Sequence, residues 1–205
     1  MMNISEHIDF DKGDGLVPAI VQDAQTLQVL MLGYMSKESV AKTYETNQVT
    51  FYSRSRKTLW TKGESSGNYL NLISLTVDCD NDTLLVMANP EGPTCHRGTV
   101  SCFGDHGASG VGFLGHLDKV VKGRVDASPD DSYTAKLLSG PLRRAAQKVG
   151  EEGVETALAA VAEDNEDNEA LLGESADLLY HLIVLLRAKE LSLTDAIEVL
   201  QSRHI

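Results

Sequence analysis

Residues that could bind metal ions are concentrated in two short segments of this chain. The first is Asp78-Cys79-Asp80-Asn81-Asp82, and the second contains Cys95 and Cys102, so that all three cysteines of the protein fall within them. Thiolates are soft ligands that suit Zn²⁺, whereas carboxylates are hard ligands that suit Mg²⁺. The spacing Cys-x15-Cys-x6-Cys differs from the paired pattern of zinc fingers. Because three protein ligands leave the fourth position of zinc open, the pattern favours a metal-dependent hydrolase.

The same residues also have a purely structural interpretation. Free cysteines often pack as small hydrophobes, and Asp80-Asn81-Asp82 could simply turn the chain between two apolar strands. The spacing leaves both interpretations open. If residues 78–82 are extended, alternation places the aspartates on one side and Cys79 on the other, so that one face cannot hold both metals. A turn at this point would weaken that argument.

Composition and charge restrict the function further. The chain has 205 residues, of which 42% are hydrophobic and 23% charged, as in a globular protein with one large domain or two small ones. Its 18 basic and 30 acidic residues give a formal net charge of −12. The sequence contains no lysine-rich arm or basic patch, which disfavours nucleic acid as a partner. A phosphorylated substrate would need local arginines, lysines or bound cations.

We expect no targeting signal in this chain. Residues 1–6 lack the basic start and apolar core of a signal peptide, and no apolar run approaches the roughly 20 residues of a membrane span. An odd number of cysteines argues against a disulfide framework. We therefore expect a cytoplasmic protein without membrane contact, whose thiols stay reduced.

The first half of the chain has short apolar runs typical of β-strands. Runs at 17–22 and 29–34 flank a polar turn, as in a hairpin, and further runs lie at 49–53, 70–77 and 83–88. Residues 36–43 are expected to form a helix with Ser36 as its N-cap. These patterns predict antiparallel strands with one helix up to about Phe103.

The second half has helical periodicity. It follows the glycine-rich stretch 104–112, which is typical of a linker. Apolar residues recur from Phe113 to Val121 at helical spacing. Pro141 suits the first turn of a helix that runs to Val161. A further helix is expected over 168–189, and a final short helix begins at Ser192. We predict a mainly antiparallel β domain with one helix (α+β) over 1–106, a linker over 107–112 and an all-α helical bundle over 113–205.

Carboxylates lie on one face of each long helix in this half. The first helix has the spacing i, i+3, i+4 and i+7 at Lys148, Glu151, Glu152 and Glu155. The second has the spacing i, i+3 and i+7 at Glu174, Asp177 and His181. The first set alone could be a solvated face of lysine–glutamate pairs. The second lies on a helix that is apolar on most faces and is therefore expected to be buried in a bundle or an oligomer. Two such helices facing each other would form an oxygen-rich site for Mg²⁺ bound to a polyphosphate.

Several motifs together resemble known enzyme families. Residues 51–56 (Phe-Tyr-Ser-Arg-Ser-Arg), residues 59–68 (Leu-Trp-Thr-Lys-Gly-Glu-Ser-Ser-Gly-Asn) and the two cysteine segments closely resemble phosphoribosyl-AMP cyclohydrolase. Residues 132–134 (Ser-Tyr-Thr), 148–155 and 174–181 resemble phosphoribosyl-ATP pyrophosphohydrolase, a helical nucleotide pyrophosphohydrolase of the MazG-like type. Together they are similar to the bifunctional enzymes of histidine biosynthesis, over nearly the whole chain and in the expected order.

The resemblance implies two consecutive hydrolyses and their metal ions. The C-terminal domain would hydrolyse phosphoribosyl-ATP to phosphoribosyl-AMP and pyrophosphate, and the N-terminal domain would open the adenine ring of phosphoribosyl-AMP between N1 and C6 with zinc-activated water. It further implies Zn²⁺ at Cys79, Cys95 and Cys102, shared across a homodimer interface, and Mg²⁺ at Asp78, Asp80 and Asp82. Magnesium in the C-terminal domain is expected at Glu152, Glu155, Glu174 and Asp177.

Individual roles are expected for further residues. Substrate-binding candidates are Arg54, Arg56, Trp60, Lys62, Glu64 and Ser66, although one arginine could be a surface charge and Trp60 could belong to the core. His96 is the candidate acid or base for ring opening, or it only orients the zinc site. Glu151 is a fifth carboxylate or a base that positions water. Lys148 could neutralise phosphate charge or pair with Glu152.

Two other functions are compatible with parts of the pattern. One is a house-cleaning nucleoside triphosphate pyrophosphatase with a structural zinc domain, against which the Arg-rich and Trp-Thr-Lys-Gly-Glu segments argue. The other is a non-enzymatic zinc module fused to a helical dimerisation domain, in which His96 or His106 would close the site as a fourth ligand.

Overall fold

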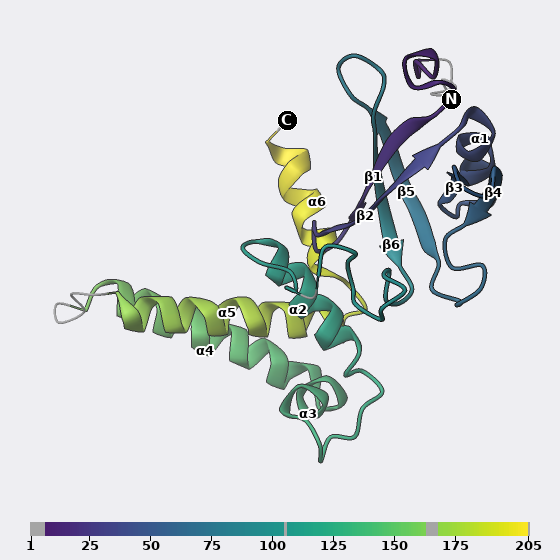
Figure 1. Cartoon of the computed structure of the whole chain (residues 1–205). Coiled ribbons are helices and arrows are strands. Elements are labelled where there is room, and N and C mark those ends of the chain that lie inside the picture. Colours follow the sequence, from purple (N-terminus) through teal and green to yellow (C-terminus); the bar gives the residue numbers. More distant parts are fainter. Residues whose placement is uncertain (1–6, 105, 163–167, 205) are drawn as a thin grey trace. The chain divides into compact units, whose positions relative to one another are not determined.

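The computed structural model describes residues 7–104, 106–162 and 168–204. The chain divides into two compact units, Met1–Gly112 (unit 1) and Phe113–Ile205 (unit 2), of which the first contains the strands and the second is helical (Figure 1). Residues 1–6, on which the expectation about a signal peptide depends, lie outside the described residues. Among the described helices, none is long and apolar enough to cross a membrane.

Unit 1 is built on a four-stranded sheet with the strand order β2-β1-β6-β5. β1 (Val17–Asp23) and β2 (Val29–Met35) form the predicted antiparallel hairpin, and β5 (Leu70–Val77) pairs antiparallel with β6 (Leu84–Pro90). The prediction of antiparallel strands is wrong for one pair, because β1 and β6 run parallel. A long connection rather than a tight turn separates these two strands in the sequence, which allows the parallel pairing. The unit is therefore mainly, but not wholly, antiparallel.

One helix and a short arm complete unit 1. α1 (Lys37–Thr46) begins as predicted, with the Ser36 side chain accepting a hydrogen bond from the Ser39 backbone. The arm consists of β3 (Thr50–Ser53) and β4 (Thr58–Thr61), and the 3-10 turn η2 (Asp11–Gly13) precedes the sheet. The apolar runs do not predict β4, since four residues are too few to show alternation.

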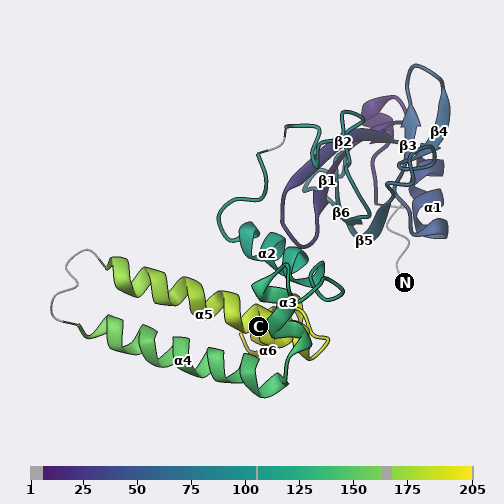
Figure 2. The same ribbon diagram turned by 90° about the horizontal axis from the view of Figure 1, so that it is seen from below.

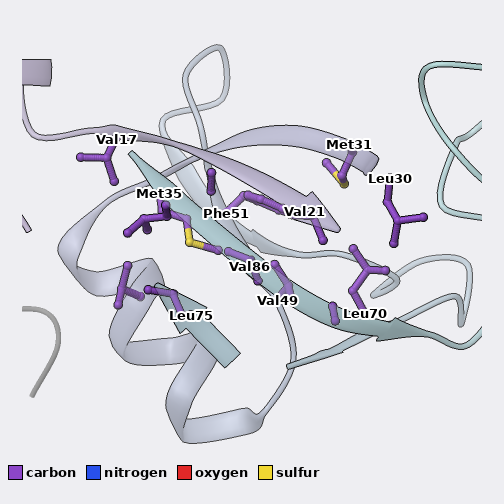
Figure 3. Packing of buried hydrophobic residues seen from close by; sticks show 14 of the residues in the cluster. Val17, Val21, Leu30, Met31, Met35, Val49, Phe51, Leu70, Leu75 and Val86 are labelled. Atoms are coloured by element: carbon purple, nitrogen blue, oxygen red, sulfur yellow. The ribbon is translucent and has the colours of Figure 1, made fainter. Parts of the chain in front are cut away.

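The core of unit 1 is made mainly by β-strand residues (Figure 3). Ile8, Val40 of α1 and Val49 complete it. Phe51, Leu30 and Met35 are among its largest fully buried side chains. Gly33 of β2 is required here, because a Cβ at this position would overlap the Phe51 ring. The core thus ties the β3–β4 arm to the sheet.

Unit 2 contains the helices α3 (Tyr133–Ser139), α4 (Leu142–Ala160), α5 (Glu169–Ala188) and α6 (Leu193–Arg203) and nearly all of α2 (Gly112–Lys122). α4 and α5 run side by side (Figure 2). Pro141 is the N-cap of α4, and Ser192 caps α6 in a capping box with Asp195. The predicted helices are confirmed, and α3 is an addition to them.

The hydrophobic core of unit 2 is small. Val121, Leu137, Ile183 and Val184 form its buried cluster. Although α5 is apolar on most faces, Leu172 and Leu179 remain 67% and 42% exposed in the single chain. One chain therefore leaves a large part of this apolar surface uncovered.

Candidate active sites

A cavity of about 490 Å³ in unit 1 collects most of the residues predicted to act in ring opening. Its walls come mainly from the end of β4, the turn at 62–68 and the loop at 93–102. The predicted residues among its lining are Arg56, Trp60, Lys62, Glu64, Ser66, Cys95, His96 and Cys102. Segments that are distant in the sequence thus meet at one concave surface.

The turn at 62–68 owes its shape to Gly63. This residue has φ of +98°, and a Cβ on it would lie 2.5 Å from the Tyr69 backbone nitrogen, so only glycine fits. Glu64 accepts a hydrogen bond from the Thr61 backbone at 2.9 Å. Lys62 is buried and donates to the Asn68 carbonyl oxygen at 3.2 Å. The turn therefore holds an ammonium group and a carboxylate in fixed positions beside the cavity.

The loop at 93–102 is anchored to the start of β2. The Cys102 backbone donates to the Leu30 carbonyl at 2.8 Å, and the Ser101 hydroxyl donates to the Val29 carbonyl at 2.7 Å. Within the loop, the Cys95 backbone donates to the Thr99 carbonyl at 3.0 Å. These bonds place both thiols at the cavity.

The two thiols and Lys62 influence one another. The backbone N–H of Arg97, with help from Thr99, lowers the pKa of the Cys95 thiol, whereas burial raises the pKa of Cys102. Burial lowers the pKa of Lys62, and negative charge on Cys102 and Cys95 opposes that effect. His96 lies at the same place, with its Nδ1 3.9 Å from the Cys95 sulfur. The surroundings therefore favour the thiolate form of Cys95 and disfavour that of Cys102.

Arg54, Arg56 and Trp60 occupy different surroundings. Arg56 lines the cavity, whereas Arg54 is absent from its lining and stacks on Tyr34, with its guanidinium carbon 3.8 Å from the ring centroid. Trp60 packs on Phe51 of the core, with ring centroids 5.1 Å apart, and also lines the cavity. The Trp60 ring therefore packs partly on the core and partly against the cavity.

The aspartates gather at the turn between β5 and β6. One carboxylate oxygen from each of Asp78, Asp80 and Asp82 lies within 4.8 Å of the others. The segment is not extended, because Asn81 has φ of +66° and Asp78 Oδ1 accepts hydrogen bonds from Asp82 N and Thr83 N, each at 3.0 Å. The alternation argument therefore does not apply, and the turn itself brings the carboxylates together.

Cys79 lies on this exposed turn and not with the other two cysteines. The three thiols are free. Among the residues that the structure describes, no group of three potential metal ligands contains a cysteine. The thiols of Cys95 and Cys102 suit zinc in chemical type, but one chain brings only these two to the cavity.

A second acidic cluster lies between α4 and α5 of unit 2. Glu152, Glu174 and Asp177 each place a carboxylate oxygen within 4.8 Å of the others, so the cluster fits a hard divalent cation. Glu155 is near this group: burial raises its pKa, and the charges of Glu152 and Glu174 raise it further. Three of the four predicted carboxylates thus lie together between the two helices, with Glu155 outside this group of three.

Basic side chains border this cluster. Lys148 Nζ lies 2.7 Å from Glu152 Oε1 and 2.9 Å from Glu151 Oε2, and these contacts raise the pKa of Lys148. Glu151 also accepts a hydrogen bond from Gln147 at 2.6 Å. Glu151 is therefore engaged by neighbours on its own helix, beside the acidic cluster.

His181 belongs to the same site, although helical spacing indicates only its position on the face. It is 5% exposed, and its Nε2 lies 3.6 Å from Glu152 Oε1. Burial lowers its pKa, partly opposed by the charge of Glu152. At 3.6 Å this pair is an electrostatic contact and not a hydrogen bond. Gly153 makes no close approach, since a Cβ there would meet only Leu178, at 4.0 Å.

Comparison with known proteins finds a different family model for each unit. The family model for phosphoribosyl-AMP cyclohydrolase matches residues 31–104, and that for phosphoribosyl-ATP pyrophosphohydrolase matches residues 114–204. The histidine biosynthesis bifunctional protein HisIE of Xanthomonas axonopodis pv. citri is 60% identical over 197 residues, which cover 96% of this chain and 93% of that protein. The chain belongs to the HisIE family.

Other HisIE proteins are similar over the same extent. The HisIE protein of Xylella fastidiosa (strain Temecula1) is 59% identical and that of Escherichia coli (strain K12) is 55% identical, each over 96% of this chain. The protein is a bifunctional hydrolase of histidine biosynthesis, with a phosphoribosyl-AMP cyclohydrolase region followed by a phosphoribosyl-ATP pyrophosphohydrolase region. Its substrates are small phosphoribosyl nucleotides.

Proposed function

We propose that ring opening takes place in the cavity of unit 1, with a zinc ion held by Cys95, Cys102 and Cys79 of a second copy of the chain. The observation that supports this most is the position of two free thiols beside Lys62, His96 and Glu64 at one cavity. Cys79 stands apart on an exposed turn, so a homodimer would complete the ligand set. Three thiolates leave one zinc position for water.

Each cavity residue has a role in this scheme. A zinc ion held by these thiolates would supply an activated water for attack at C6 of the adenine ring. His96 delivers a proton to the departing N1, as a positioned acid. Arg56 binds the substrate phosphate by charge-assisted hydrogen bonds, and Trp60 offers its ring to the base. Lys62, Glu64 and Ser66 orient the substrate from the turn.

Pyrophosphate release is assigned to the acidic cluster of unit 2. Glu152, Glu155, Glu174 and Asp177 would hold Mg²⁺, which neutralises charge on the triphosphate. Lys148 adds a positive charge at the edge of the cluster and Glu151 positions the attacking water. His181 orients Glu152. The product, phosphoribosyl-AMP, is the substrate of the cavity in unit 1.

The aspartate turn is the second proposed magnesium site. Asp78, Asp80 and Asp82 offer three hard oxygen donors that already lie together. The protein is proposed to act in the cytoplasm, where its three free thiols remain reduced. The boundaries 1–106, 107–112 and 113–205 are proposed for the two domains and their linker.

The experiment that tests this assignment separates the two activities by substitution. Cys95→Ala should abolish ring opening of supplied phosphoribosyl-AMP, because a zinc ligand is lost, while pyrophosphate release from phosphoribosyl-ATP stays near wild type. Glu155→Gln should stop pyrophosphate release, because a magnesium ligand loses its charge, and leave ring opening near wild type. Both products are followed separately, with Mg²⁺ and Zn²⁺ supplied.

The two variants serve as controls for each other. Circular dichroism should show wild-type helix content in both, so that lost activity is not lost folding. If each folded variant lost both activities together, the assignment to two sites would be wrong. If Cys95→Ala retained ring opening, the cavity thiols would not be zinc ligands.

A further inference from the structure

One basic side chain reaches the aspartate turn from a distant part of the sequence. Lys12 belongs to η2 and lies 68 positions before Asp80 in the sequence. Its Nζ lies 2.8 Å from the Asp80 carbonyl oxygen, 3.0 Å from Asp80 Oδ2 and 3.4 Å from Asp82 Oδ2. An ammonium group has three N–H donors and no acceptor. Three oxygens of the turn therefore accept from all three donors of Lys12.

Backbone hydrogen bonds hold the segment that contains Lys12 next to the aspartate turn. The Asp9 backbone donates to the Asn81 carbonyl oxygen at 2.7 Å, which ties the segment before η2 to the turn. Asp9 Oδ1 in turn accepts hydrogen bonds from Asp11 N at 3.1 Å and Lys12 N at 3.3 Å. The start of the chain's described part is thus fastened to the turn independently of the lysine ammonium.

Hydrogen bonds that do not involve the lysine also hold the turn. Asp78 Oδ1 holds the backbone of Asp82 and Thr83, and the Thr83 hydroxyl donates to Asp82 Oδ1 at 3.2 Å. These bonds leave Asp80 Oδ2 and Asp82 Oδ2 facing Lys12. The Lys12 ammonium group therefore lies at the position between the Asp80 and Asp82 carboxylates where a cation would bind.

A divalent ion and the ammonium cannot use these oxygens at once. Mg²⁺ binds its oxygen ligands at about 2.0–2.1 Å and demands near-octahedral geometry. A positive ammonium within hydrogen-bond distance of the same oxygens would repel the ion and block its approach. The Lys12 side chain is 42% exposed, so it can move into solvent when a metal ion takes its place.

We propose that Lys12 is a tethered cation that competes with the divalent metal ion for the Asp78–Asp80–Asp82 cluster, so that metal binding and lysine release are one exchange. This inference rests on the proposed magnesium site at the turn. The new element is that Lys12 sets the affinity of this site for Mg²⁺. In the metal-free protein Lys12 neutralises part of the acidic charge of the turn, and in the metal-bound protein Lys12 is free.

The affinity test is a Mg²⁺ titration of the full chain. Backbone amide resonances of Asp82 and Thr83 report the turn, and their chemical shifts are followed in the wild type, Lys12→Met and Lys42→Met. Lys42 is the matched control, since it is similarly exposed at 44% and pairs with Glu45 away from the turn. Loss of two exposed ion pairs and of the competing charge should lower the Mg²⁺ dissociation constant about 5-fold in Lys12→Met. Lys42→Met should match the wild type.

A second readout separates exchange from a general charge effect. Acetylation of each lysine by a dilute reagent is measured by mass spectrometry with and without Mg²⁺. The exchange predicts that Mg²⁺ increases the modification of Lys12 severalfold and leaves Lys42 unchanged. One result would overturn the exchange: Mg²⁺ binds more tightly to Lys12→Met, but it does not change the acetylation of Lys12 in the wild type. That result would show only a long-range electrostatic effect of the lysine charge.

The remaining outcomes distinguish the inference from the proposed site. An equal or weaker affinity in Lys12→Met would refute competition while leaving the magnesium site in place. If Mg²⁺ shifted the Asp82 and Thr83 resonances in neither protein, the magnesium site itself would be absent, and the exchange with it. Binding seen only in Lys12→Met would support competition in its strongest form.

Discussion

Arg54 and Arg56 show how two neighbouring residues of one type can have different surroundings. Arg54 stacks on the Tyr34 ring, and a guanidinium over an aromatic face gains a cation–π interaction. Arg56 instead lines the cavity with Lys62, Cys95 and His96. The sequence leaves open which arginine is a surface charge, and the lining of the cavity favours Arg56 as the phosphate ligand.

Paired substitutions test this distinction. Arg56→Gln should raise the KM of phosphoribosyl-AMP at least 10-fold, because a charge-assisted hydrogen bond to phosphate contributes about 1.5–3 kcal/mol. Arg54→Gln, the matched control, should change KM less than 3-fold. Steady-state kinetics of ring opening measures both. An effect of Arg54→Gln as large as that of Arg56→Gln would contradict the assignment.

Residue types predict chemistry better than they predict contacts. The thiols, aspartates and helical carboxylates are visible in the sequence because their types and spacing are unusual. The contact between Lys12 and Asp80 spans 68 residues, so no local pattern indicates it. The turn that gathers the aspartates depends on the positive φ of Asn81, which asparagine tolerates but does not require.

At the level of elements, a buried ion pair joins α2 to α5. Arg187 Nε donates to Asp118 Oδ1 at 2.6 Å, and its Nη2 donates to Asp118 Oδ2, which makes a bidentate pair. The side chains are only 4% and 12% exposed for Asp118 and Arg187. Because the hydrophobic core of unit 2 is small, this ion pair is expected to contribute substantially to the packing of α2 on α5.

Breaking the pair should destabilise unit 2. Asp118→Asn removes one charge and leaves Arg187 without its ionic partner, which should cost about 3 kcal/mol of unfolding free energy. Urea unfolding followed by circular dichroism at a helical wavelength measures the loss. Asp126→Asn, at an exposed position of the same unit, is the control and should change it by less than about 0.5 kcal/mol. Equal midpoints for the two variants would show that the pair contributes nothing net.

Most elements can be predicted from local signals. Ser36 and Ser192 mark helix starts through their side-chain caps, and alternation marks β1. The parallel pairing of β1 with β6 could not be predicted, because it depends on which distant strand lies beside β1. β4 and α3 are too short to show a period of their own.

At the level of the whole molecule, one chain keeps its three thiols in two separate places and leaves apolar helical surface exposed. Cys79 is apart from the other two thiols. On α4 and α5, Val154, Leu158 and Leu172 are each at least 60% exposed. Exposed apolar residues of this size on a helical hairpin are typical of a surface that another subunit covers. Both features support the proposed homodimer.

The central claim is that one zinc site is built from two copies, and mixed dimers test it directly. Cys79→Ala and Cys95→Ala homodimers should each lack ring opening. After unfolding and refolding of an equal mixture, half of the dimers carry both variants, and one of their two sites has all three native cysteines. We therefore predict about 25% of wild-type ring opening in the mixture. No recovery, although mass spectrometry shows the mixed dimer, would contradict a site shared between subunits.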